Sequence, residues 1–168
     1  MNKNLVLTGM MGVGKSTIGR LLAKKLKVKF FDVDKAIEKK ERKSIRRIFE
    51  DKGEKYFREI EEIITLNILK EQNLVVSLGG GAFLNKKIKS EILKNHVSFW
   101  LNWDIKTLVD RVKNSQKRPL AFNSTKQNLI KIIKKRSIIY SKAMYKINCD
   151  NLSKNQIAKD IMDFYENT

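Results

Sequence analysis

The stretch that decides the fold is Gly9-Met10-Met11-Gly12-Val13-Gly14-Lys15-Ser16-Thr17. It follows the P-loop pattern, in which two glycines separated by four residues precede a lysine and a hydroxyl residue. Leu5–Thr8, just before it, is a short apolar run typical of a strand, and apolar residues recur at helical spacing from Ile18 to Leu26. The pattern requires this strand–loop–helix context, so the sequence predicts a nucleotide-binding loop.

The glycines explain how such a loop holds phosphate. Without a Cβ they adopt backbone angles that other residues avoid, so backbone N–H groups and the start of the next helix converge on an anion. The lysine of a P-loop reaches the β- and γ-phosphates, and the hydroxyl after it suits Mg²⁺. We therefore expect Lys15 to be catalytic, Ser16 to bind the metal ion, and ATP to bind at Gly12, Val13, Gly14, Lys15, Ser16 and Thr17.

The composition fits one folded domain. The chain has 168 residues and a single cysteine, Cys149, which excludes an internal disulfide. The sequence shows no signal peptide and no apolar run long enough to cross a membrane. We therefore expect one domain over residues 1–168 in a cytoplasmic, monomeric protein with no membrane partner.

The net charge of +18 is spread along the chain rather than gathered in one block. Dispersed charge is typical of solvated surfaces, so we expect no nucleic-acid partner. The positive electrostatic field of the protein would still attract an anionic substrate. Only eight of the 36 Lys and Arg residues are arginine. Arginine offers a planar fork that fits carboxylates and phosphates. This makes four arginines near the expected cleft candidate ligand-binding residues: Arg58, Arg111, Arg118 and Arg136.

Apolar runs alternate with helical patterns along the chain. Besides Leu5–Thr8, strands are predicted over 29–34, 74–78, 97–101 and 145–149, and a helix follows each strand. Gly53 divides the helical region 44–70 into two helices. Such alternation is typical of a parallel sheet with helices on both faces. The sequence thus predicts an α/β fold with three layers (α/β/α) around a five-stranded parallel sheet.

Ligands of such sheets bind beyond the carboxyl ends of the strands. Asp32 and Asp34 end the predicted strand 29–34, and because strand side chains alternate, both carboxylates should share one face. Asp32 would hold Mg²⁺, and Asp34 would accept the proton of a substrate hydroxyl; the alternative is that Asp34 only caps the next helix. Gly79-Gly80-Gly81 end another strand and offer a second close approach of backbone to a ligand.

Together these residues resemble those of the shikimate kinases, within the nucleoside-monophosphate-kinase type of P-loop fold. The likeness runs nearly end to end and combines the P-loop with Phe31-Asp32-Val33-Asp34, Gly53-Glu54, Phe57-Arg58, Glu61, Gly79-Gly80-Gly81-Ala82, Arg118-Pro119-Leu120, Arg136 and Tyr140. The chain departs from the family pattern at Arg42-Lys43, where a glycine is common. It also departs around Arg136, where the family usually has a preceding Glu and a following x-Pro-Leu-Tyr.

The resemblance implies ATP-dependent phosphorylation of the 3-hydroxyl of shikimate, a step towards chorismate and the aromatic amino acids. It implies that Asp34 binds the ring hydroxyls and that the carboxylate is held by Arg58, Arg136 and the backbone at Gly80 and Gly81. Arg111 would lie near the nucleotide. Arg118 would be catalytic and contact ATP from a lid at about 114–124, and the acceptor would bind a segment at about 33–61.

Two other interpretations stay open on sequence alone. A gluconate or nucleotide kinase of the same fold would share the P-loop, but a nucleotide acceptor would need arginines aimed at a second phosphate. A P-loop regulator or nucleic-acid-binding protein would have no need for the combination of Lys15, Ser16, Asp32, Asp34 and Arg118.

Overall fold

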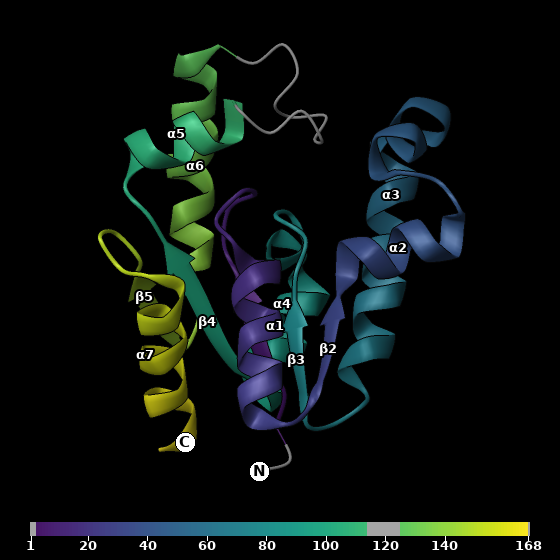
Figure 1. Cartoon of the computed structure of the whole chain (residues 1–168). Helices are drawn as coiled ribbons and strands as arrows, with labels where there is room; N and C mark the ends of the chain where they lie inside the picture. Colours follow the sequence, from purple (N-terminus) through teal and green to yellow (C-terminus); the bar gives the residue numbers. More distant parts are fainter. Residues whose placement is uncertain (1–2, 114–124, 168) are drawn as a thin grey trace.

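The computed structural model describes residues 3–113 and 125–167. Its centre is a sheet of five strands in the order β2-β3-β1-β4-β5 (Figure 1). Every neighbouring pair is parallel. The strands are β1 (Leu5–Thr8), β2 (Lys29–Asp32), β3 (Leu74–Ser77), β4 (Val97–Asn102) and β5 (Tyr145–Asn148). The helices are α1 (Lys15–Leu26), α2 (Val33–Glu41), α3 (Ile45–Leu69), the short 3₁₀ helix η1 (Ala82–Leu84), α4 (Lys86–Asn95), α5 (Ile105–Lys113), α6 (Lys126–Tyr140) and α7 (Lys154–Glu166).

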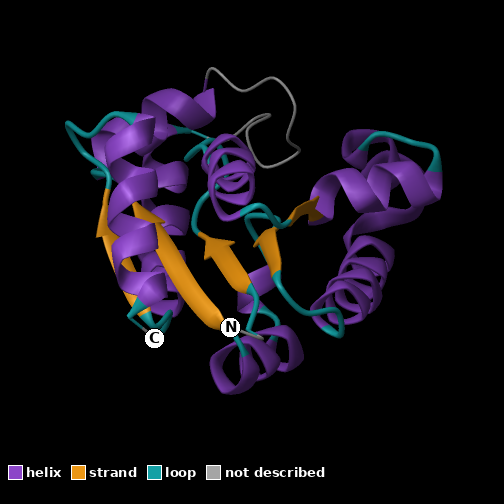
Figure 2. Ribbon diagram, turned by 60° about the horizontal axis from the view of Figure 1, so that its bottom comes forward, coloured by secondary structure: helices purple, strands orange, loops and turns teal. Residues whose placement is uncertain are grey.

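The central strands are covered on both faces. All four residues of β1 and of β3 are buried, which explains why both segments are unbroken apolar runs in the sequence. α1 and α7 pack together on one face of the sheet, and α4 lies on the other (Figures 1 and 2). The predicted three-layer α/β fold is confirmed. None of the helices within residues 3–113 and 125–167 is both long and apolar enough to cross a bilayer.

The predicted strand over 29–34 is too long. β2 ends at Asp32, and Val33 already belongs to α2. The Asp32 carboxylate accepts a hydrogen bond from the Lys35 backbone N–H at 3.2 Å, so Asp32 is the N-cap that starts the helix. The argument that Asp32 and Asp34 share one face of a strand is therefore wrong, as is the alternative that Asp34 is the cap.

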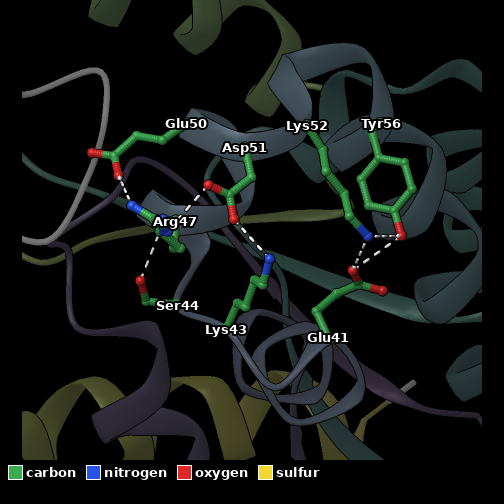
Figure 3. Close-up of polar contacts among 8 residues, drawn as sticks. All are labelled: Glu41, Lys43, Ser44, Arg47, Glu50, Asp51, Lys52 and Tyr56. Atoms are coloured by element: carbon green, nitrogen blue, oxygen red, sulfur yellow. Dashed lines mark hydrogen bonds and ion pairs between the residues drawn. The ribbon is translucent and has the colours of Figure 1, made fainter.

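α2 and α3 stand together beside β2, at one edge of the sheet (Figure 1). Gly53 has φ 77° and ψ 173°, so it interrupts α3, as the two predicted helices require. Polar contacts join α2 to α3 near this kink (Figure 3). Among them, the Glu41 carboxylate accepts hydrogen bonds from Lys52 at 2.9 Å and from the Tyr56 hydroxyl at 3.0 Å. Since Lys52 and Tyr56 flank Gly53, these contacts hold both sides of the kink against α2.

Candidate active site

The P-loop opens into a cleft of about 250 Å³ beyond the carboxyl ends of β1 and β3. Residues of the predicted phosphate site line it together with one of the predicted catalytic carboxylates. The lining residues are Gly12, Gly14, Lys15, Ser16, Thr17, Asp34, Ser77 and Leu78. The structure thus brings the nucleotide loop and Asp34 into one cleft, although they are separated in the sequence.

Glycine backbone angles shape the P-loop, and the lysine of the motif folds back over it. Gly12 has φ 79° and Gly14 has φ 92°, angles that favour glycine, and they turn the backbone into the start of α1. The Lys15 side chain is buried and folds back over the loop, where Nζ donates to the carbonyls of Gly9 at 2.9 Å and Met10 at 2.8 Å. The ammonium group therefore lies above the backbone cradle, where phosphate oxygens would bind.

The carboxylates of Asp32, at the end of β2, and of Asp34, which lines the cleft, have different neighbours. The Ser16 hydroxyl donates to Asp32 Oδ2, which joins the start of α1 to the end of β2. Asp34 lies in the first turn of α2, is 8% exposed and faces the loop after β3. The Asp32 carboxylate therefore contacts the predicted metal ligand Ser16, whereas the Asp34 carboxylate lies beside Gly79 in the loop after β3.

The triple-glycine loop needs glycine because groups from other parts of the chain lie very close to its backbone. A Cβ at Gly79 would lie 2.7 Å from carboxylate oxygens of both Asp34 and Glu61. One at Gly80 would lie 3.1 Å from the backbone nitrogen of Met11 in the P-loop, and one at Gly81 would lie 2.4 Å from Nη1 of Arg58. Real Cβ atoms essentially never come within 3.0 Å of another atom and rarely come within 3.4 Å, so the three glycines let two carboxylates, a guanidinium and the P-loop meet at one loop.

Arg58 is oriented by two glutamates of its own helix. Nη1 donates to the buried carboxylate of Glu61 at 2.7 Å, and Nη2 donates to Glu54 at 3.1 Å. Burial works against the charge of Arg58, but the Glu61 and Glu54 carboxylates outweigh it and raise the pKa of the guanidinium above its ordinary value. Arg58 is thus a fixed cation whose fork lies against Gly81.

Arg136 reaches the same loop from α6. It is buried, and Nη1 donates to the carbonyl of Gly80 at 3.4 Å. One turn further along α6, the hydroxyl of Tyr140 donates to the same carbonyl. The family's usual proline after this arginine is replaced here, and α6 runs without a break to Tyr140. Despite this departure in sequence, Arg136 lies against the triple-glycine loop.

Trp103, a residue that the sequence analysis missed, lies beside the P-loop and against Arg111. The guanidinium of Arg111 lies 3.7 Å from the ring centre of Trp103, and the indole N–H of Trp103 donates to the carbonyl of Val13 at 3.3 Å. Arg111 also borders the P-loop, since a Cβ at Gly12 would lie 3.6 Å from Arg111 Cβ. The only signal in the sequence was a tryptophan directly after the strand 97–102, where the parallel-sheet rule places ligand contacts.

Arg118 and the lid predicted at about 114–124 lie outside the described residues. Each of the other predicted site residues lies either at the P-loop cleft or around the triple-glycine loop. The contact of Gly80 with Met11 places these two sets side by side.

A phosphate-binding loop, a serine–aspartate pair beside it and two arginines that lie against the facing loop define a P-loop kinase with an acceptor site for a small anion. The model of the family "Shikimate kinase" matches residues 11–166. The chain belongs to the shikimate kinase family.

Individual relatives agree with this assignment. The shikimate kinase of a Sulfurihydrogenibium species is 42% identical over 160 residues, covering 95% of this chain and 96% of that protein. The shikimate kinase of Bacillus subtilis is 40% identical over 167 residues, covering 96% and 88%. These relatives favour shikimate kinase over the gluconate kinase, nucleotide kinase and regulatory interpretations.

Solved structures agree as well. Shikimate kinase from Acinetobacter baumannii in complex with shikimate has a TM-score of 0.94 at 29% identity, covering 99% of this chain and 94% of that one. Shikimate kinase from Aquifex aeolicus has a TM-score of 0.87 at 32% identity, covering 97% and 96%. The fold described above is therefore shared with these two shikimate kinases.

Proposed function

We propose that this chain transfers the γ-phosphoryl group of ATP to the 3-hydroxyl of shikimate, giving shikimate 3-phosphate and ADP. Membership of the shikimate kinase family supports the reaction. The observation that carries the assignment to this site is the meeting of Asp34, Arg58 and the P-loop at the triple-glycine loop.

The acceptor is held at both of its ends. Arg58 and Arg136 bind the carboxylate, because guanidinium forks match a carboxylate in two parallel hydrogen bonds. The backbone at Gly80 and Gly81 completes this end. Asp34 lies against Gly79 of the same loop and receives the ring hydroxyls. An acid with neighbouring hydroxyl groups is therefore bound in one orientation, with the reacting hydroxyl near the P-loop.

Phosphoryl transfer then needs positioning and charge stabilisation more than covalent chemistry. The 3-hydroxyl oxygen bonds to the γ-phosphorus while the bond to the oxygen bridging the β- and γ-phosphates breaks. Asp34 accepts the proton of the attacking hydroxyl, and ADP leaves with the bridging oxygen. Lys15 and the N–H groups from Gly12 to Thr17 balance the charge on the phosphates. Arg111 with Trp103 borders the nucleotide, and Arg118 adds a further cation.

Mg²⁺ fits the residues present. Ser16 and Asp32 supply a hydroxyl and a carboxylate next to the phosphate loop, and hard oxygen ligands are those that Mg²⁺ prefers. The described residues contain no group of three or more His, Cys, Asp or Glu side chains that could hold a metal ion. Kinase sites need no such cage, because phosphates and water fill most of the coordination sphere. When bound, the ion would neutralise charge on the β- and γ-phosphates.

We place the acceptor-binding segment at about 33–61 within a single domain over residues 1–168. The position of Asp34 and Arg58 on α2 and α3 supports this segment. The lid at about 114–124, carrying Arg118, rests on the resemblance to the family.

The proposal is tested by measuring ADP release with shikimate, gluconate and nucleoside monophosphates in parallel, each with ATP and Mg²⁺. We expect turnover with shikimate at least two orders of magnitude above that with the others, because only shikimate places both a carboxylate and hydroxyls in this site. Comparable turnover with gluconate or with a nucleotide would overturn the assignment.

A further inference from the structure

The peptide between Gly80 and Gly81 is held from one side by α6. The carbonyl of Gly80 accepts hydrogen bonds from the Tyr140 hydroxyl and, at 3.4 Å, from Nη1 of Arg136. No peptide bond in the described residues is cis. In a trans peptide the carbonyl and the following N–H point in opposite directions. The N–H of Gly81 therefore points away from the two donors on α6.

The neighbouring peptides are fixed in a similar way. The carbonyl of Gly79 accepts from the N–H of Ala82 at 3.1 Å, and that of Gly81 accepts from the N–H of Leu84 at 3.0 Å. These contacts lie within the turn that leads into η1 and need no help from another element. The carbonyl of Gly80 is the one that depends on side chains from a distant helix.

A peptide flanked by two glycines needs such a hold. Neither Gly80 nor Gly81 has a Cβ to restrict rotation of the plane between them, so little steric resistance opposes a flip. Tyr140 is suited to the task because it is 2% exposed and its ring packs near Trp100. Burial raises the pKa of the Tyr140 phenol to about 12, against a smaller opposite effect of the Arg136 charge, so the hydroxyl remains a donor at every pH of interest.

We propose that Tyr140 is a positioning residue for the acceptor, because its hydroxyl locks the Gly80–Gly81 peptide with the Gly81 N–H turned towards the acceptor carboxylate. The inference rests on the proposed function, which brings that carboxylate to Arg58 and Arg136. The inference also assigns separate roles to the two donors at the Gly80 carbonyl, Arg136 and Tyr140. When Arg136 turns its fork to the carboxylate, Tyr140 still satisfies the buried carbonyl of Gly80, which would otherwise lack a partner.

The test is the steady-state kinetics of Tyr140→Phe, which keeps the ring and removes the donor. Net hydrogen-bond strengths in proteins correspond to about threefold to tenfold in an equilibrium constant. We therefore expect KM for shikimate to rise by about threefold to tenfold, with kcat and KM for ATP unchanged.

Tyr165→Phe is the matched control. Tyr165 is also buried, and its hydroxyl donates to a backbone carbonyl, that of Lys3, at 2.6 Å, away from the triple-glycine loop. Both variants should lose similar amounts of thermal stability, but only Tyr140→Phe should change KM for shikimate. An unchanged KM in a folded Tyr140→Phe, with a Tm loss like that of the control, would overturn the inference.

A second measurement uses the unaltered protein and decides the matter if Tyr140→Phe does not fold. The amide resonance of Gly81 is followed by NMR during titration with shikimate, with the amide of Gly53 as an internal reference. We expect the Gly81 proton to move downfield as it donates to the carboxylate. A Gly81 amide that does not move at saturation would overturn the inference. If the protein bound no shikimate and turned none over, the proposed function would fail first.

Discussion

Replacing Gly81 by alanine tests how closely Arg58 approaches the triple-glycine loop. The new Cβ would lie 2.4 Å from Nη1 and 2.8 Å from Cζ and Nη2 of Arg58. Carbon–nitrogen contacts are comfortable only at about 3.5 Å, so the guanidinium has to move by about 1 Å. The obstacle is the far end of a flexible side chain. We therefore expect the chain to fold and Arg58 to give way.

The size of the effect follows from what Arg58 would lose. Hydrogen bonds to a charged group contribute about 1.5–3 kcal/mol, which corresponds to roughly 10-fold to 100-fold in binding. KM for shikimate should rise by that factor, while KM for ATP stays the same. The backbone of Gly81, with φ −108° and ψ −14°, suits alanine, so any loss of stability should come from the disturbed Arg58–Glu61 ion pair and not from backbone strain.

The assay is ADP release with shikimate and ATP varied in turn, together with thermal denaturation. Gly53→Ala is the control, and it is expected to change stability without changing the binding of shikimate or ATP. Nothing lies within 4 Å of its new Cβ, but its φ of +77° is strained for alanine. That variant should lose about 1–3 kcal/mol of stability and keep its KM values. A Gly81→Ala enzyme with unchanged KM for shikimate would refute the close approach of Arg58 to the acceptor.

Two further substitutions separate chemistry from nucleotide binding. Asp34→Asn should lower kcat by about 10²-fold to 10⁴-fold with little change in KM for ATP, because it removes the proton acceptor and leaves the P-loop intact; near-normal kcat would make Asp34 a structural residue. Trp103→Phe removes the donor to Val13. It should raise KM for ATP by about threefold to tenfold and leave KM for shikimate unchanged; an equal rise in both would contradict a role at the nucleotide end.

Much of the fold could be predicted because a parallel sheet imposes a simple pattern. β1 and β3 are buried on both faces, so their sequences are continuous apolar runs that are easily recognised. The end of β2 could not be predicted as well. Val33 and Asp34 suit a strand by alternation, but the side chain of Asp32 caps Lys35 and starts the helix at once. Local hydrogen bonding of one side chain outweighed the strand pattern.

The part of the site that could be predicted is the part whose motif follows from local backbone geometry. The P-loop glycines need unusual backbone angles, and that need is visible in the sequence. The triple glycine has a different reason, the approach of Asp34, Glu61 and Arg58 from other elements, which no local pattern contains. For the same reason the roles of Trp103 and Tyr140 became apparent only when the segment after β4 and helix α6 were placed beside the two loops.

One departure from the family has a local explanation. In the Arg42-Lys43 segment, where the resemblance leads us to expect a glycine, Arg42 ends α2 with φ 52° and ψ 30°, the left-handed conformation that glycine adopts without strain. The turn is therefore kept although the residue differs. The departure bears on the stability of the α2 end rather than on the site.

The central claim is that Arg58 recognises the acceptor through its carboxylate, and the most direct test compares shikimate with its carboxamide in two enzymes. Arg58→Lys is the variant of choice, because it keeps a cation beside the buried Glu61 and loses only the fork. The ratio of kcat/KM for shikimate to that for the carboxamide is measured in each. We predict a ratio on the order of 10² or more in the unaltered enzyme and about tenfold less in Arg58→Lys. The same ratio in both enzymes would contradict the account.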